Sequence, residues 1–82
     1  MKKSKQLPSS LEWHNVKGAK RERLILERQK RKLTQKELAE KIGVSKSTIG
    51  FLETGRSKPG FDVSMALVEF FGIEFEILFP DL

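Results

Sequence analysis

Apolar residues recur at helical spacing in the middle of the chain, in two short blocks. Leu38, Ala39 and Ile42 form the first block, and their spacing predicts a helix that is apolar on one face. Ile49 and Leu52 lie three residues apart and predict a second helix with a narrower buried stripe. The pattern therefore predicts two consecutive amphipathic helices joined by a short turn.

Residues that begin and end helices stand at the borders of these blocks. Thr34 and Glu37 have the three-residue spacing of a capping box, which begins a helix by satisfying its first N–H groups. Gly43 can end that helix in the left-handed conformation, and Ser45 is a favoured first cap for the next one. Residues 34–54 therefore have the layout of a helix-turn-helix motif, whose second helix enters the major groove of DNA.

Further helices are expected on both sides of this motif. A first helix is expected from about residue 17 to residue 32, although its apolar residues are consecutive and its periodicity is poor. A fourth is expected at 61–71, ending at a glycine. Its core-facing residues are expected to be Met65, Leu67, Val68 and Phe71.

The chain resembles the Cro/cI-type (XRE) family of helix-turn-helix DNA-binding domains from about Leu24 to Phe79. The residues that carry the resemblance are Leu33-Thr34-Gln35, Glu37-Leu38-Ala39, Gly43-Val44-Ser45, Ile49, Leu52-Glu53, Gly55, Lys58-Pro59 and Gly72-Ile73. The resemblance implies an all-α, compact, lambda-repressor-like bundle of about five helices that binds operator DNA as a dimer. It places the domain at 17–82 and leaves residues 1–16 outside.

The two ends of the chain leave alternatives open. The lysines of residues 1–16 could form an arm that reaches DNA, or a frayed solubilising tail. In the same segment, Trp13 and Val16 could fold back over Ile25 or Leu26. The resemblance implies a short fifth helix at 73–79, which we expect, although apolar and acidic residues alternate there as in a strand.

The composition is that of one small globular domain. Eighty-two residues lie near the lower limit for an unassisted hydrophobic core. No apolar run approaches the roughly 20 residues of a membrane-spanning helix, and the N-terminus lacks the apolar core of a signal peptide. We therefore expect no membrane partner and a cytoplasmic location, on the nucleoid when bound to DNA. The absence of cysteine excludes a disulfide framework and a cysteine-ligated metal site, and we expect no metal and no cofactor.

The net charge of +5 is distributed unevenly. Residues 1–32 hold eleven Lys/Arg against three Glu, a balance of +8, and residues 33–58 balance to +2. Residues 59–82 contain five acidic groups and no Lys or Arg. A basic pole attracts a polyanion such as DNA with salt-dependent affinity. The alternative interpretation is that the basic helices only solvate the surface.

The motif residues expected at double-stranded DNA are mostly polar or basic and lie at the starts of the two motif helices. They are Thr34, Gln35, Lys36, Ser45, Lys46, Ser47, Thr48, Phe51, Arg56 and Lys58. Lys46 could bond a guanine edge, and Gln35 could hold a phosphate at its helix N-terminus. Phe51 could contact a thymine methyl group or belong to a dimer or core contact.

The resemblance also implies residues with structural roles. Arg28 is expected to form a partly buried ion pair with Glu53, which ties the first helix to the recognition helix at 45–54. The apolar residues Ala66, Phe70 and Ile77 stand where the family more often has polar ones, and an exposed apolar patch usually marks a partner surface. We predict a homodimer through this acidic, apolar end, with a thicker monomer core as the alternative.

The functional prediction is a sequence-specific DNA-binding regulator, most simply a repressor of a palindromic operator. An enzyme is not expected, because the chain has one histidine, His14, no cysteine and no phosphate-binding glycine loop. The alternative is an antitoxin of a toxin–antitoxin module that represses its own operon and binds a toxin protein. Its protein partner would use the N-terminal extension.

Overall fold

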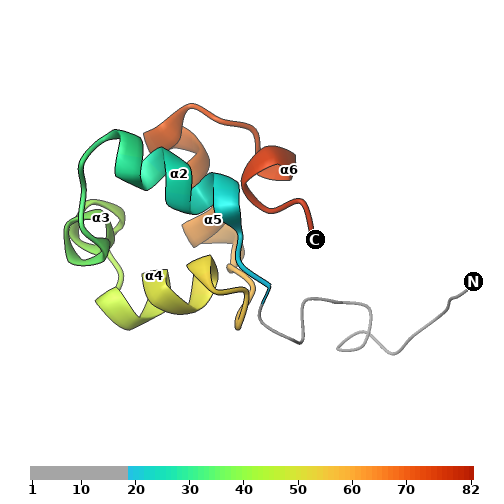
Figure 1. Ribbon diagram of the computed structural model, residues 1–82, viewed down its shortest axis with the longest axis horizontal. Coiled ribbons are helices and arrows are strands. Elements are labelled where there is room, and N and C mark those ends of the chain that lie inside the picture. Colours follow the sequence, from blue (N-terminus) through green and yellow to red (C-terminus); the bar gives the residue numbers. More distant parts are fainter. Residues whose placement is uncertain (1–18) are drawn as a thin grey trace, which may run out of the picture.

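Five helices and no strand make up residues 19–82, the part of the chain that the computed structural model describes (Figure 1). The helices are α2 (Glu22–Lys30), α3 (Gln35–Ile42), α4 (Lys46–Glu53), α5 (Phe61–Phe71) and α6 (Phe75–Leu78). The predicted all-α fold is confirmed, and the final segment forms the expected short helix. The predictions about residues 1–16, including the contacts of Trp13 and Val16, lie outside the described residues.

The helices enclose a single apolar core. α3 packs against α4 and α5, while α2 packs against α4 and α6. Figure 1 shows α4 at the edge of the bundle, below α2, with no helix of the described chain covering its outer side. The buried core residues are Leu24, Leu38, Ala39, Ile49, Leu52, Leu67, Phe71, Leu78 and Phe79. This arrangement buries one face of α4 and leaves the opposite face at the surface.

The helix-turn-helix begins and ends at the predicted caps. The Glu37 N–H donates to Thr34 Oγ1 over 3.0 Å, and the Thr34 N–H donates to Glu37 Oε1 over 2.8 Å, which completes the capping box. Gly43 ends α3 with φ +89°, a left-handed conformation that side chains disfavour. Ser45 Oγ accepts the Thr48 N–H over 3.2 Å and caps α4.

α2 is shorter than the predicted helix at 17–32, because tertiary contacts set its start. Arg21 leaves the helical conformation, and its N–H donates to the Glu53 carbonyl over 2.9 Å. At the other end, Lys32 adopts φ +58°, and the Leu33 N–H donates to the Arg28 carbonyl over 3.3 Å. This is a Schellman-type ending with lysine in the position that glycine usually occupies, so no glycine marked it in the sequence.

The prediction that Met65 faces the core was wrong. Its side chain is 41% exposed, whereas Ser64, Leu67 and Phe71 form the buried face of α5. These three positions are spaced by three and four residues and so share one helical face, which Met65 lies beyond. The Ser64 hydroxyl avoids a desolvation penalty by donating to the Gly60 carbonyl over 2.8 Å.

A buried carboxylate on α2 pairs with cations of that helix and of its C-cap. Glu27 is 1% exposed, and its oxygens accept from Arg31 Nη1 at 2.8 Å and Arg23 Nε at 2.6 Å, with Lys30 Nζ at 3.5 Å. Arg31 also donates to the Phe71 carbonyl over 3.0 Å and lies over that ring. The cluster therefore fixes α2 to the end of α5.

These contacts predict an acid-sensitive contribution to stability. The hydrogen bonds from Arg31 and then Arg23 lower the pKa of Glu27 from 4.5 to about 2. Because the folded-state pKa is lowered, the stabilisation is complete above pH 4.5 and is lost as the pH falls toward 2. The gap in unfolding free energy between wild type and Glu27→Gln should therefore narrow across this window in urea titrations.

Glu40→Gln, which removes an exposed carboxylate from α3, serves as the matched control for the loss of one charge. If the difference in unfolding free energy between wild type and Glu27→Gln stayed constant from neutral pH to pH 2, Glu27 would not titrate in this way.

Candidate nucleic-acid interface

The outer face of α4 carries a mixture of polar, basic and aromatic side chains. Lys46 and Ser47 are exposed, and Phe51 is 47% exposed. On the opposite face, Ile49 and Leu52 are buried in the core. The core therefore holds the helix in place while its first turn and a half remain available to a ligand.

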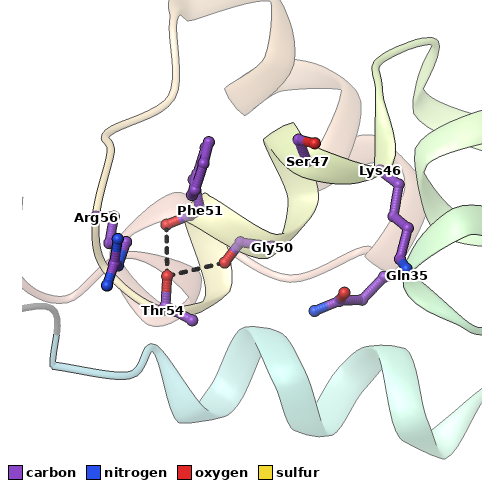
Figure 2. A pocket seen from close by; sticks show the side chains of 7 residues that line it. All are labelled: Gln35, Lys46, Ser47, Gly50, Phe51, Thr54 and Arg56. Atoms are coloured by element: carbon purple, nitrogen blue, oxygen red, sulfur yellow. Dashed lines mark hydrogen bonds between the residues drawn. The ribbon is translucent and has the colours of Figure 1, made fainter.

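This face lines an open hollow of about 480 Å³, which α3, α4 and the following loop build together. Its lining residues are Gln35, Lys46, Ser47, Gly50, Phe51, Thr54 and Arg56. Figure 2 shows Ser47 and Phe51 pointing to one side of α4 and the Lys46 side chain directed toward Gln35. The hollow thus combines two cations, an amide, hydroxyls and one apolar ring.

The loop that follows α4 is held against the helix end. The Arg56 N–H donates to the Phe51 carbonyl over 2.9 Å. The Thr54 hydroxyl donates to the carbonyls of Gly50 and Phe51 over 2.9 and 3.3 Å (Figure 2). These bonds place the Arg56 backbone beside Phe51 and satisfy carbonyls that a helix end leaves unpaired.

The buried carboxylate of Glu53, next to Gln35 of the hollow, joins α2, α3 and α4. Glu53 Oε2 accepts from Arg28 Nε over 2.6 Å, and Glu53 Oε1 accepts from Arg28 Nη2 over 3.2 Å. Glu53 Oε1 also accepts from Gln35 Nε2 over 3.0 Å. The expected Arg28–Glu53 pair is thus present, and it extends to a residue of the hollow itself.

The amide of Gln35 is oriented by this network. Gln35 Nε2 donates to Glu53, and the whole amide lies beside Gly50, with Oε1 at 3.8 Å and Nε2 at 3.9 Å from where a Cβ of that residue would stand. Those distances are ordinary van der Waals contact, so the packing does not require a glycine at position 50. The glycine leaves the hollow deeper beside Gln35 than another residue would.

Arg21 is a structural residue that sequence reasoning missed. It is 2% exposed, and its Nε and Nη2 donate to the two carboxylate oxygens of Asp81, each over 2.9 Å. Its Nη1 donates to the carbonyls of Leu52 and Ser57 over 2.8 and 2.7 Å. Arg21 therefore ties the end of α4 to the C-terminal segment, and only the fold brings these positions together.

Five of the cations that precede the motif form ion pairs within the domain. Arg21, Arg23, Arg28, Lys30 and Arg31 all pair with buried or half-buried carboxylates. The basic residues expected at DNA differ from them: Lys36, Lys46, Arg56 and Lys58 are exposed, and none forms an ion pair within residues 19–82. Arg23, Lys30 and Arg31 keep 41%, 57% and 35% of their side chains exposed, so pairing does not remove them from the surface. The basic pole of residues 1–32 therefore stays a prediction.

The structure separates the other predicted DNA residues by position. Gln35, Lys46, Ser47, Phe51 and Arg56 lie together around the hollow. The oxygens of Thr34 and Ser45 are engaged in capping. The remaining residues, Lys36, Thr48 and Lys58, are exposed or half-buried and do not line the hollow.

The three residues predicted at a dimer interface lie on α5 and α6, which pack together. Ala66 and Phe70 are half-buried, four residues apart on one face of α5. Ile77 on α6 is 40% exposed. The Phe70 ring packs edge-to-face on Phe71, with 5.2 Å between ring centres.

Residues 19–82 contain neither a membrane-spanning helix nor a cluster of metal ligands. No helix there is long and apolar enough to cross a membrane. No group of three or more histidine, aspartate or glutamate side chains in that range is arranged to hold a metal ion.

A protein family and several known proteins are similar to this chain in sequence. A helix-turn-helix family matches residues 24–78. A protein of Methanocaldococcus jannaschii named an uncharacterised HTH-type transcriptional regulator is 40% identical over 47 residues, which are 57% of this chain and 71% of that protein.

Two Archaeoglobus fulgidus proteins bear a similar name. One is 40% identical over 47 residues, which are 57% of this chain and 67% of that protein. The other is 36% identical over 52 residues, 63% of this chain and 73% of that protein. No solved structure matches the chain.

Proposed function

Because the chain belongs to the Cro/cI-type (XRE) helix-turn-helix family of DNA-binding transcriptional regulators, we propose that it is a repressor that binds a palindromic operator as a homodimer. The observation that carries the proposal is the hollow on the outer face of α4, with an oriented amide and two cations that form no ion pair within residues 19–82. An α-helix fits the major groove, where base edges carry a distinct pattern of donors and acceptors.

The side chains of the hollow match two kinds of DNA contact. Lys46 stands on the first turn of α4 and can donate to guanine O6 and N7, while Ser47 can bond several bases. Gln35 begins α3, and the positive end of that helix suits a backbone phosphate. Arg56 and Lys58 lie beyond α4 and can hold further phosphates.

A homodimer supplies the contacts that one small module lacks. Two-fold symmetry presents two recognition helices to half-sites about one helical turn apart. We assign the interface to Ala66, Phe70 and Ile77, because α5 and α6 expose apolar surface there. The segment 59–82 is acidic, so an interface on it keeps that charge away from DNA.

Selection of bound duplexes from a random pool, at low and at high salt, tests this function. We expect a palindrome with half-sites about one turn apart, enriched at both salt concentrations. Binding without a recovered sequence, abolished at moderate salt, would contradict specific repression and leave only a general polyanion surface.

Two classes of substitution should separate base contacts from phosphate contacts. Lys46→Ala should change the preferred base at one position of each half-site, with a loss of about 1–3 kcal/mol for each half-site of the original operator. Lys58→Ala should weaken binding to all duplexes alike and reduce the salt dependence by about one counterion per half-site. Titrations of the selected operator and a scrambled duplex at several salt concentrations measure both effects.

Lys41→Ala is the matched control, because Lys41 is exposed on α3 and does not line the hollow. If Lys46→Ala weakened both duplexes equally, Lys46 would be a phosphate contact. The antitoxin alternative depends on residues 1–16, which lie outside the described residues, and no observation on residues 19–82 favours it.

A further inference from the structure

One exposed aromatic ring on α4 has no structural task within the described fold. Phe51 is 47% exposed, whereas Phe71 and Phe79 are buried in the core. Phe51 is also absent from the ring pairs that join the other phenylalanines of the core region. The expectation that it could be a core residue is therefore wrong, and its ring is available to a ligand.

The ring lies among the polar groups of the hollow. Phe51 is four residues after Ser47, so both stand on one face of α4, one turn apart. Figure 2 shows the two side chains pointing to the same side of the helix. Because Lys46 and Arg56 also line this hollow, a duplex that these cations hold brings base edges to the ring.

A phenyl ring has no hydrogen-bonding group, so it distinguishes bases only by their apolar parts. In the major groove the apolar group of an unmodified base pair is the C5-methyl group of thymine. We propose that Phe51 recognises the C5-methyl group of a pyrimidine in each operator half-site. The source of that methyl group is thymine, and 5-methylcytosine carries the same group at the same carbon.

This assignment rests on the proposed operator binding, and it specifies what the site reads. Thymine also carries an O4 acceptor, but the ring cannot use it. Recognition at this position should therefore follow the methyl group and not the hydrogen-bonding pattern of the base. Lys46 and Ser47 would read the hydrogen-bonding groups of neighbouring bases.

Uracil substitution tests the proposal, because it removes only the methyl group. Each thymine of the selected operator is replaced by deoxyuridine, one half-site position at a time, and affinity is measured with wild type and Phe51→Ala. Wild type should bind about fourfold less tightly at one position when one half-site is changed, and about fifteenfold less when both are, since burying one methyl group is worth about 0.8 kcal/mol. Phe51→Ala should bind the thymine and uracil operators equally.

A second set of duplexes distinguishes the two sources of the methyl group. At the sensitive position, cytosine and 5-methylcytosine are compared in the same operator. Wild type should bind the methylated duplex more tightly, by a similar factor, and Phe51→Ala should not. A gain from thymine without any gain from 5-methylcytosine would overturn recognition of the methyl group alone.

Two variants keep the test decisive if Phe51→Ala binds too weakly to measure. Phe51→Leu retains an apolar side chain and should keep part of the preference for the methylated base. Phe61→Ala removes another exposed ring, 77% exposed on α5 and outside the hollow, and should keep the full preference. Equal affinity of wild type for every uracil operator would overturn the proposal, whereas failure to recover any operator would instead refute the proposed function.

Discussion

Arg21→Met should lower the free energy of unfolding by about 3–5 kcal/mol, because it breaks a pair whose guanidinium is buried and removes the donor of two carbonyls. The Arg21 side chain is 1% exposed, and its guanidinium forms a two-pronged pair with Asp81 while lying 5.1 Å from the centre of the Phe79 ring. Methionine fills part of the space but donates no hydrogen bond. The Leu52 carbonyl, which accepts from Arg21 over 2.8 Å, then loses a partner in the interior.

Urea denaturation followed by circular dichroism measures this loss. Lys20→Met is the matched control, because Lys20 is the exposed neighbour of Arg21 and should change stability by less than about 0.5 kcal/mol. A result for Arg21→Met within the range of that control would show that the pair with Asp81 does not stabilise the domain. Arg21→Met should lower the stability of the fold without removing a side chain from the hollow on α4, since Arg21 does not line it.

Glu53→Ala should also lower the free energy of unfolding by about 3–5 kcal/mol, and it should weaken DNA binding. The Glu53 side chain is 2% exposed, and it is the common acceptor of Arg28 and Gln35. Removing it leaves the Arg28 guanidinium, which is 12% exposed, without its carboxylate partner. It also frees the Gln35 amide to rotate. At a temperature where the variant is still folded, affinity for the operator should fall as well, because the Gln35 amide is no longer held.

A double-mutant cycle separates the ion pair from the loss of packing. If the pair dominates, Arg28→Met combined with Glu53→Ala should destabilise by less than the sum of the two single changes, since no charge is then left unpaired. Glu40→Ala, at an exposed position of α3, controls for the removal of a carboxylate. Additive single and double effects would contradict the assigned role of the pair.

Structure that depends on neighbours within a few residues could be read directly from the chain. The capping box of Thr34 and Glu37 and the left-handed ending at Gly43 join groups three to four residues apart, so their chemistry is visible in the spacing. The same holds for the apolar stripe that turns Ile49 and Leu52 inward and leaves Lys46 and Ser47 outside. Arg28 and Glu53 could be paired only through the family resemblance, since nothing local relates them.

Long-range pairings and surface availability were decided by the tertiary structure. Arg21 and Asp81 are 60 residues apart, and only the packing of α2 against α6 brings them together. Spacing also could not show that Met65 lies outside the core, because the strip that is buried on α5 depends on where α3 and α6 press against it.

The sequence by itself therefore determined the two motif helices, their caps and the exposed first turn of the second one, because hydrogen bonds within one turn and helical periodicity are local properties. The tertiary structure decided which charged side chains are buried in ion pairs, such as Arg21 and Glu53, and which side chains remain exposed, such as Lys46 and Phe51. Charge pairing and burial depend on what the rest of the chain places nearby, and a linear sequence does not contain that information in its local spacing.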